Sequence, residues 1–575
     1  MIRLIARLVL AAAIFSCPVT ARAFDVTLLH ANDSHSYLDA TADKIAPQGA
    51  STYASLGGWT RLTSAVAVVR AEQANVILLH AGDAVQGGLY YMKYGGKPEM
   101  EFLDRLGFDA FTPGNHEFDR GPAYLARILG YTRVPAVCAN LDASAVPALA
   151  ARVKPYVIIK RGGDRVGVIG LTTPETKLIS SPGNVRFSDE VHAATLIVRE
   201  LEARGVNKIV LLTHVGYDED KRLAATIPGV DVIVGGHSHT LLGNPDGIEA
   251  MGLRPAGAYP TVVKGADGSD VYVVTAWKWG RVLGRLDLTF DDAGRVTKAE
   301  GKPALILADS FKRKNDAGQK VEVQGGDRDA LLAFIASNPE AAVVPADPAA
   351  RKFLGPFSEG VEAMRTEVIG EAVLPLPHIR VPGVTDTGES LSRGSLIAPL
   401  VCQSMLARLK GTGEPADIAL QNAGGVRESV DQGDITVGTA YTLMPFSNTL
   451  VLLRLTGAQV RQALETGVDR GEGAFPYVGG ARYTADMRQP EGHRVLSIDT
   501  LDHQGNWTPL DPVRTYRLVT NSYLASGGDG YAVLKDAASS CDTGFVDAQA
   551  FIEYVRQQRM LKPLPTTGVT YIPAK

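Results

Sequence analysis

Cysteine is scarce in this 575-residue chain, and no two of its four cysteines lie close together in the sequence. They are Cys17, Cys138, Cys402 and Cys541. This spacing excludes the dense disulfide framework of small secreted domains and the paired thiolates of a structural zinc site. One disulfide could still form among the last three, but the sequence does not select its members.

An excess of positive charge is also missing. Lysine and arginine together number 58 and aspartate and glutamate 62, so the formal net charge is −4. A protein that binds a nucleic-acid polymer gains most of its affinity from neutralising phosphates with a basic surface. The composition therefore predicts no nucleic-acid partner, and a small anionic substrate would have to be met by metal ions or a few arginines.

Long hydrophobic runs are missing as well, because no later stretch reaches the length of about 18 unbroken apolar residues that suggests a transmembrane segment. The N-terminal run Leu8–Phe15 is shorter than that and follows Arg3 and Arg7. With the small-x-small site Ala21-Arg22-Ala23, this pattern predicts a cleaved signal peptide and a periplasmic or secreted protein. Cys17 leaves a lipid-anchored N-terminus as an alternative, although the residues before it match a lipoprotein box poorly.

The length of the chain favours two large domains, because one hydrophobic core rarely organises this many residues. From Asp25 to about Phe290, short β-branched runs alternate with helical stretches, which predicts the buried strands of a layered α/β domain. The expected strands are 26–29, 76–79, 166–171, 209–212 and 230–234, and the expected helices include 62–71 and 193–203.

A polar stretch follows, and then a second alternation of strand-like and helix-like segments begins. The expected strands there include 449–455 and 515–520, and the expected helices 396–409 and 458–466. We therefore predict a signal peptide over 1–23, a first domain over 24–290, a linker with a connecting helix over 291–365, and a second α/β (α+β) domain over 366–575.

Residues that can bind metal ions follow five strands of the first domain. In open α/β sheets, sites form outside the carboxyl ends of the strands, so five such ends can converge on one crevice. The segments are Asp33-Ser34-His35, Gly82-Asp83, Gly114-Asn115-His116-Glu117, His214, and Gly235-Gly236-His237-Ser238-His239.

The residue types in these segments indicate which metals would bind. Carboxylates and neutral imidazoles without thiolates suit borderline divalent ions such as manganese, zinc or cobalt. The Asp83 carboxylate could bridge two ions about 3.5–4 Å apart, the separation found in two-metal hydrolases. Glycines beside Asp83, Asn115 and His237 let the backbone turn sharply near the ions.

In their order and spacing, these segments resemble the calcineurin-like metallophosphoesterase domain of 5′-nucleotidases. The resemblance implies a four-layer β-sandwich flanked by helices, two bound divalent ions, and a catalytic pair formed by His116 and Asp119. It assigns one ion to Asp33, His35, Asp83 and His239, and the other to Asp83, Asn115, His214 and His237. Some bacterial relatives carry an amide at the position of His239, so the imidazole here bears on the metal preference.

The second domain contains three segments suited to binding a nucleotide. Phe446 and Tyr523 could sandwich a base, since stacking contributes about 1–3 kcal/mol with little base preference. Asp529 could accept hydrogen bonds from ribose hydroxyls, and Arg427 could pair with phosphate. The segments are Asn422-Ala423-Gly424-Gly425-Val426-Arg427, Pro445-Phe446-Ser447-Asn448, and Tyr523 to Tyr531.

This set resembles the C-terminal domain of 5′-nucleotidases and UDP-sugar hydrolases, so the resemblance covers nearly all of the mature chain. It implies that Asn422, Arg427, Phe446, Asn448, Tyr523 and Asp529 bind substrate. Two departures stand out. Tyr523 replaces the phenylalanine usual in bacterial relatives. The segment that in the family supplies a phosphate-binding arginine and a Gly-Asn or Gly-Arg pair reads Gly394-Ser395 here. The nearby arginine, Arg393, is not at the usual place and is the remaining candidate for binding phosphate.

The sequence therefore predicts a secreted dimetal phosphohydrolase that removes the 5′-phosphate from nucleotides and extends to UDP-sugars, with a role in nucleotide catabolism. A 2′,3′-cyclic-nucleotide phosphodiesterase with 3′-nucleotidase activity is the main alternative on the same domains. A thiosulfate-ester hydrolase is disfavoured by the two aromatic residues. A non-catalytic surface binding protein is disfavoured because every metal position is kept. The sequence does not indicate whether the protein is a monomer or an oligomer.

Overall fold

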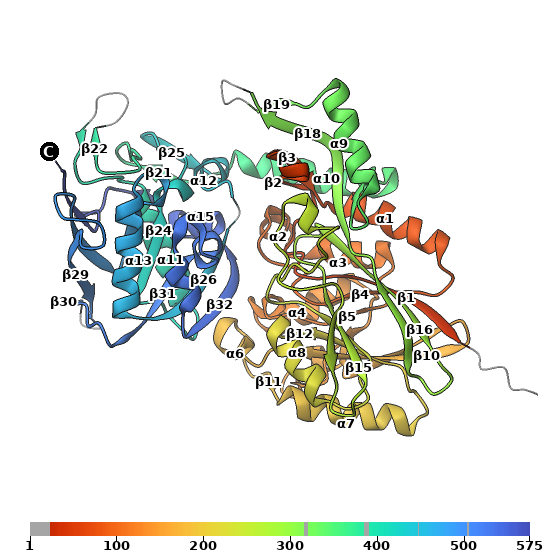
Figure 1. Ribbon diagram of the computed structural model, residues 1–575. Helices are drawn as coiled ribbons and strands as arrows, with labels where there is room; N and C mark the ends of the chain where they lie inside the picture. Colours follow the sequence, from red (N-terminus) through yellow and green to blue (C-terminus); the bar gives the residue numbers. More distant parts are fainter. Residues whose placement is uncertain (1–22, 316–319, 385–389, 447, 503–504, 575) are drawn as a thin grey trace, which may run out of the picture.

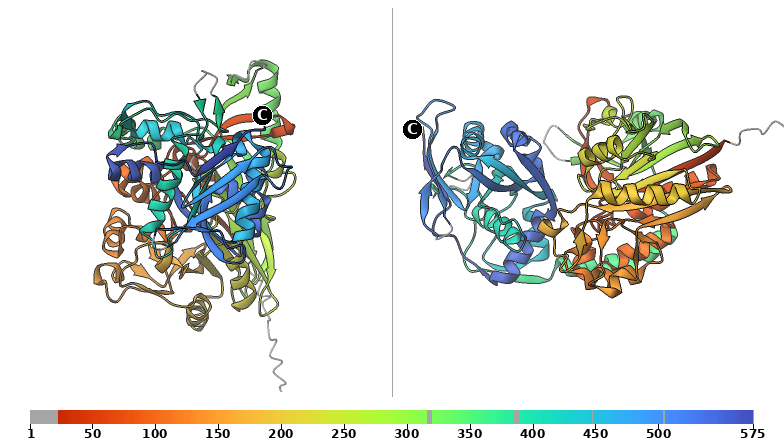
Figure 2. Two further views of the ribbon diagram at one scale, coloured as in Figure 1. Left: turned by 90° about the vertical axis from the view of Figure 1, so that its left-hand side faces the viewer. Right: turned by 90° about the horizontal axis from the view of Figure 1, so that it is seen from below.

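The computed structural model describes residues 23–315, 320–384, 390–446, 448–502 and 505–574. The predicted signal peptide and Cys17 lie outside these residues. Two domains lie side by side, with the N-terminal half of the chain on the right of Figure 1 and the C-terminal part, in blue, on the left. The view from below in Figure 2 shows the same arrangement. Within the described ranges, none of the helices combines the length and the apolar character needed to cross a bilayer.

The first domain contains two large sheets, and the predicted strands are confirmed in both. β1 (Phe24–Ala31) lies in the first sheet, antiparallel to β16 and parallel to β4. In the described part of the chain, the main order is β2 (Thr41–Ile45), β3 (Thr52–Leu56), β18 (Ala304–Lys314), β16 (Val282–Phe290), β1, β4 (Val76–His80), β5 (Ala110–Phe111), β6 (Ala136–Val137) and β8 (Val153–Lys154).

The second sheet of this domain has four neighbouring parallel strands at its centre. Its order is β14 (Thr261–Lys264), β15 (Asp270–Thr275), β13 (Val232–Gly235), β12 (Ile209–His214), β10 (Asp164–Thr172) and β9 (Tyr156–Arg161). Because β10, β12, β13 and β15 run in the same direction, their carboxyl ends meet at one edge, where the predicted ligands follow.

The domain has four layers, two large sheets with helices on the outer side of each, because successive side chains along the strands point to opposite faces of a sheet. Leu28 and Ile77 belong to the apolar core between the two sheets, whereas their neighbours Leu29 and Leu78 pack on the other side. That outer side of the first sheet is covered by α1 (Trp59–Glu72) and α3 (Lys97–Leu106), and the outer side of the second sheet by α7 (Glu190–Ala203) and α8 (Tyr217–Thr226). The predicted four-layer α/β architecture is therefore confirmed.

Much of the segment 291–365 lies in the first sheet. β17 (Val296–Gly301) pairs with β16, and β19 (Lys320–Glu322) and β20 (Ala341–Val343) pair with β18. After α9 (Gly325–Ser337) and β20, helix α10 (Pro348–Arg365) leads into the second domain. We therefore propose that the first domain continues through β20 and that α10 is the connection between the domains.

In the part of the chain that the structure describes, the second domain contains a five-stranded sheet, helices that pack against it, and a smaller four-stranded sheet. The five-stranded sheet in the described residues has the order β27 (Pro476–Gly479), β24 (Ile418–Asn422), β31 (Thr515–Asn521), β26 (Thr449–Thr456) and β32 (Ser539–Val546). Helices α11 (Ala398–Lys410) and α15 (Asp547–Gln558) contact each other beside it, and α13 (Gly457–Arg470) contacts β26. A second sheet has the order β30 (Trp507–Pro509), β29 (Val495–Leu501), β28 (Ala481–Asp486) and β34 (Val569–Ile572).

Candidate dimetal centre and nucleotide pocket

The seven predicted metal ligands meet at the carboxyl ends of strands from both sheets of the first domain. Asp33 and His35 follow β1, Asp83 follows β4, and Asn115 follows β5. His214 is the last residue of β12, and His237 and His239 follow β13. The strand ends thus bring together residues that lie up to 206 positions apart in the sequence.

Three of these residues form a first group of converging ligand atoms. The Nε2 atoms of His35 and His239 lie 2.9 Å apart, and Asp33 Oδ1 lies 3.8 Å and 3.5 Å from them. Atoms that bind one tetrahedral ion at about 2.1 Å lie about 3.4 Å from one another. The observed separations therefore suit a single divalent ion.

A second group lies beside the first and shares Asp83 with it. His214 Nε2 is 3.0 Å from Asp83 Oδ2 and 3.2 Å from Asn115 Oδ1. A ligand atom of His237 lies within 4.8 Å of those of Asp83 and His214. The same Asp83 oxygen lies 3.8 Å from His35 Nε2 of the first group, so it stands between the two groups.

The environment of these side chains suits positive ions. Asp33 and Asp83 are almost completely buried, and among the described residues neither has a lysine or arginine within salt-bridge distance. Burial lowers the pKa of His35 well below its usual value and that of His237 to about 3, so both imidazoles are neutral and can act as ligands. At His214, burial is outweighed by the Asp83 carboxylate, which raises the pKa to about 10, so the centre favours bound positive charge, which divalent ions would supply.

The backbone at five of the seven positions is held in the left-handed region. The φ angles are 47° at Asp33, 46° at His35, 51° at Asp83, 79° at His237 and 50° at His239. Non-glycine residues rarely adopt this conformation, and strain of this kind clusters at functional sites because the surrounding structure has to enforce it. The turns after the strands are therefore shaped to direct these side chains inward.

Two glycines allow the loops of the centre to approach one another. A Cβ atom at Gly114 would lie 2.1 Å from Asp83 Oδ1, and one at Gly82 would lie 2.4 Å from His214 Nδ1. No side chain fits at these distances. The Glu117 carboxylate fixes the same loops, because it accepts hydrogen bonds from the backbone N–H groups of Asp83, Ala84 and Gly114.

The predicted catalytic pair is in contact. His116 Nδ1 lies 2.8 Å from Asp119 Oδ2, and Ser180 Oγ donates to Asp119 Oδ1 at 2.8 Å. Burial lowers the pKa of His116, but the carboxylates of Asp119 and Asp83 outweigh burial and raise it to about 9. His116 can therefore carry a proton at neutral pH while Asp119 fixes the orientation of its ring.

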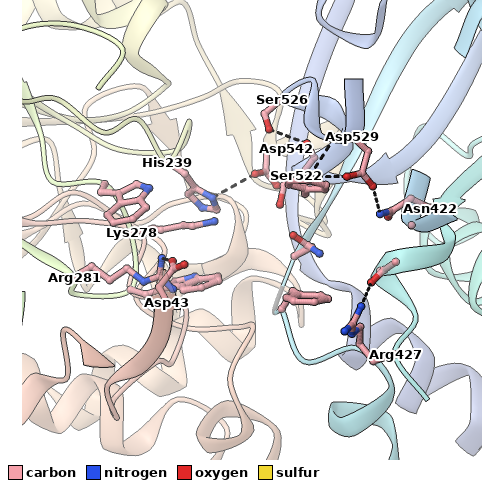
Figure 3. Close-up of a pocket in the computed structure, with 18 of the residues that line it drawn as sticks. Asp43, His239, Lys278, Arg281, Asn422, Arg427, Ser522, Ser526, Asp529 and Asp542 are labelled. Carbon is pink, nitrogen blue, oxygen red and sulfur yellow. Dashed lines mark hydrogen bonds and ion pairs between the residues drawn. The ribbon is translucent and has the colours of Figure 1, made fainter. Parts of the chain in front are cut away.

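A cavity of about 810 Å³ lies between the two domains, and the metal centre borders it through His239. Seven residues of the second domain were predicted to bind substrate, and all of them except Arg393 line this cavity. The six are Asn422, Arg427, Phe446, Asn448, Tyr523 and Asp529. In Figure 3, His239 and Lys278 on the first domain face Asp529, Asn422 and Arg427 on the second. The cavity thus connects the metal-ligand candidates of the first domain with the substrate-binding candidates of the second.

The nucleotide-binding candidates are connected by hydrogen bonds. Asp529 accepts from Tyr523 OH at 2.7 Å and from Asn422 Nδ2 at 2.9 Å (Figure 3). Phe446 is 52% exposed and Tyr523 46%, which is unusual for large aromatic side chains in a folded domain and leaves ring faces free for stacking. The Arg427 guanidinium lies 5.6 Å from the centre of the Phe446 ring.

Arg393 does not line the cavity, in contrast to the expectation from sequence. The turn that carries it is held elsewhere, because Tyr477 OH accepts a hydrogen bond from Ser395 N and the Arg393 carbonyl accepts one from Thr567. Arg380 lines the cavity instead. Its guanidinium lies 3.8 Å from the carboxylate of the exposed Glu472.

Several lining residues were not singled out from the sequence, and Lys278 and Asp542 are the two that bear on the chemistry of the site. Lys278 follows the carboxyl end of β15, so the same strand-end reasoning could have found it. Asp542 lies within β32 of the second domain and contacts His239 of the first. No local sequence signal marks Asp542, because its partner lies in the other domain.

Comparison with known proteins gives two family matches that cover different parts of the chain. Residues 26–241 match the calcineurin-like phosphoesterase family, and residues 377–536 match the 5′-nucleotidase C-terminal domain. The first range contains all seven metal-ligand candidates, and the second contains the six predicted substrate-binding residues that line the cavity.

Curated relatives match nearly the whole chain. A probable 5′-nucleotidase of Treponema pallidum is 36% identical over 95% of this chain and 94% of its own length. An NAD 5′-nucleotidase of Haemophilus influenzae is 31% identical over 96% of this chain and 94% of its own length. The solved structure of the H. influenzae NAD nucleotidase superposes with a TM-score of 0.84 at 30% identity, covering 96% of this chain and 99% of that one.

Proposed function

The chain belongs to the 5′-nucleotidase family and is a phosphohydrolase that acts on nucleotides, and we propose that its specific reaction is removal of the 5′-phosphate with two divalent ions bound. One observation carries this proposal: a single cavity has the candidate metal centre on one wall and half-exposed aromatic rings on the other. A nucleotide that spans this cavity places its phosphate and its base in environments suited to each.

We propose the following division of roles in the first domain. One ion is held by Asp33, His35, Asp83 and His239, and the other by Asp83, Asn115, His214 and His237. Bound divalent ions supply Lewis acidity, which lowers the pKa of water and neutralises the charge of the phosphate. The donor set favours manganese, zinc or cobalt. The His116 imidazolium would protonate the departing 5′-oxygen while Asp119 holds the ring in place.

In the second domain, Phe446 and Tyr523 would hold the base between their rings. Asp529 would accept hydrogen bonds from the ribose hydroxyls, since its oxygens have lone pairs left beside the bonds from Tyr523 and Asn422. Arg427 would contact the phosphate. From the N-terminal pattern, which lies outside the described residues, we also propose secretion or periplasmic location.

A substrate panel tests the proposed reaction. Purified protein would be assayed with AMP, 2′,3′-cyclic AMP, UDP-glucose and p-nitrophenyl phosphate, with and without a chelator. We expect a higher kcat/KM for AMP than for cyclic AMP or p-nitrophenyl phosphate, loss of activity with chelator, and recovery on adding manganese, zinc or cobalt. A preference for the cyclic nucleotide, or full activity in the presence of chelator, would contradict the proposal.

We propose, as a second activity of the same site, cleavage of the phosphoanhydride bond in substrates such as NAD or UDP-sugars. Lys278 favours this activity. Its ammonium lines the cavity beside His239 and lies 4.3 Å from the centre of the Trp279 ring, and within the described residues no carboxylate is within salt-bridge distance of it. An unpaired ammonium next to the metal centre suits a second phosphate group. The name of the H. influenzae relative, an NAD 5′-nucleotidase, agrees with this assignment.

Replacement of Lys278 by glutamine tests this second activity. A hydrogen bond to a charged group contributes about 1.5–3 kcal/mol, so we expect kcat/KM for NAD and UDP-glucose to fall at least about tenfold. The value for AMP should change by less than about threefold, because the ions and Arg427 already meet its single phosphate. Lys298→Gln, at an exposed lysine on β17, serves as the control. Equal loss with all three substrates, or no loss, would contradict a role for Lys278 in binding the second phosphate.

A further inference from the structure

We propose that Asp542 of the second domain is the residue that orients His239 of the first, so that one of the two ion sites is completed across the domain boundary. This inference rests on the proposed function, because it takes His239 as a metal ligand. It assigns to Asp542 a positioning role, since the carboxylate would act on the ion through the imidazole.

The contacts of His239 point in two directions. Its Nε2 atom faces Asp33 and His35, the other members of its group. Its Nδ1 atom lies 3.3 Å from Asp542 Oδ2, and Figure 3 shows this ion pair crossing the cavity from one domain to the other. The imidazole therefore stands between a ligand group of its own domain and a carboxylate of the other.

The Asp542 carboxylate is fixed within its own domain. Its Oδ2 atom accepts a hydrogen bond from Thr449 Oγ1 at 2.7 Å, and its Oδ1 atom accepts one from the Gly544 N–H at 3.0 Å. β32, which carries it, pairs with β26 in the five-stranded sheet. Asp542 is thus presented to His239 in a defined orientation by its own sheet.

An imidazole that binds a metal through Nε2 carries its proton on Nδ1, and this N–H group needs an acceptor. Metal-binding histidines almost always donate it to a carboxylate, a carbonyl or water, which fixes the tautomer and strengthens the ligand. His239 Nδ1 is buried and has no well-aligned hydrogen-bond partner in the described part of the protein, and Asp542 is the carboxylate within salt-bridge distance of it. A small rotation of the ring would align this pair.

The rest of β32 fits the metal centre closely. Gly544 has a φ of +66°, and a Cβ atom there would lie 2.3 Å from His116 Nε2 and 3.1 Å from His35 Cε1. The Phe545 ring lies 5.3 Å from the His116 ring in an edge-on arrangement. One strand of the second domain thus contacts three side chains of the proposed active site, so the contact with His239 belongs to a fitted surface.

Metal titration of the full-length protein tests this role of Asp542. Loss of such an outer partner typically weakens metal affinity 10- to 100-fold. In Asp542→Ala, titrated with Mn²⁺ alone by calorimetry, we expect one of two sites to weaken by about that factor and the other to keep its affinity. Asp542→Asn keeps one acceptor oxygen, which can serve the imidazole and Thr449 only if the amide nitrogen faces the Gly544 N–H, so its loss should be intermediate.

Controls separate this role from a general effect on the second domain. Asp529→Ala removes another carboxylate from the same cavity but should leave Mn²⁺ affinity unchanged while weakening nucleotide binding. Asp542→Ala should add no further loss when His239 is already replaced by glutamine, because both act on the same ion. If Asp542→Ala does not fold, the comparison of Asp542→Asn with the wild type decides.

Two outcomes would overturn the inference. In the first, every Asp542 variant that folds binds Mn²⁺ at both sites as tightly as the wild type does. In the second, the substitution weakens Mn²⁺ binding equally at both sites. Failure of the proposed function would look different, since the wild-type protein itself would then bind fewer than two Mn²⁺ ions or would not hydrolyse AMP.

Discussion

Replacement of Asp83 by asparagine is expected to remove both ions from the protein and to lower kcat/KM for AMP by at least about 10³-fold. The Asp83 carboxylate is the shared member of the two ligand groups, with Oδ2 3.0 Å from His214 Nε2 and 3.8 Å from His35 Nε2. Without its charge, each group loses an anionic ligand. Metal ions contribute several kcal/mol of transition-state stabilisation, and about 4 kcal/mol corresponds to the expected loss.

The substitution is chosen so that folding is preserved. Asparagine tolerates the left-handed φ of 51° better than most residues, and its side-chain oxygen can still accept the hydrogen bond from the His116 N–H. Metal analysis and steady-state kinetics measure the effect. Asp220→Asn serves as a matched control, because Asp220 is buried in the same domain and bonds to Thr213 without contacting the ligand groups. Retention of two ions and most of the activity in Asp83→Asn would contradict a bridging role.

Replacement of His116 by asparagine is expected to lower kcat by about 10²- to 10⁴-fold while both ions stay bound. His116 lies beside the ligand groups, with its ring 5.3 Å from that of His35, and its Nδ1 is held by Asp119. Removing it takes away the proton donor for the leaving oxygen and leaves the seven ligand candidates in place. Turnover and metal content of the same preparation measure the effect.

Asp119→Asn provides the graded comparison for His116. The amide oxygen of asparagine can still accept from the His116 ring while its nitrogen donates to Ser180 Oγ, so we expect a smaller fall in kcat than for His116→Asn. An equal loss of metal and of turnover in His116→Asn would show that His116 holds the centre together, and would contradict its role as a proton donor.

The dimetal candidates could be predicted from sequence because strand periodicity and residue chemistry coincide there. Asp33, Asp83 and His214 each end or follow a short apolar strand, and parallel strands bring such ends to one edge. Lys278 follows β15 by the same rule, but lysine is no metal ligand, so a search for ligands passed over it.

Other features depend on long-range structure that local patterns do not contain. The polar strands β17 and β19 lie at the margins of the first sheet, where exposed positions make a strand resemble a linker. Arg380 lines the cavity and Arg393 does not. Ser395, in the turn after Arg393, packs on Tyr477, which lies 82 residues further along the chain. The contact of Asp542 with His239 depends on how the two domains sit together.

We propose above all that side chains from Asp33 to His239 hold a pair of divalent ions. A crystal structure of the protein with manganese, using anomalous scattering to locate the ions, tests it most directly. We expect two ions per chain, about 3.5–4 Å apart, with the Asp83 carboxylate between them. A single ion at this centre, or manganese bound elsewhere with these side chains free of it, would contradict the account.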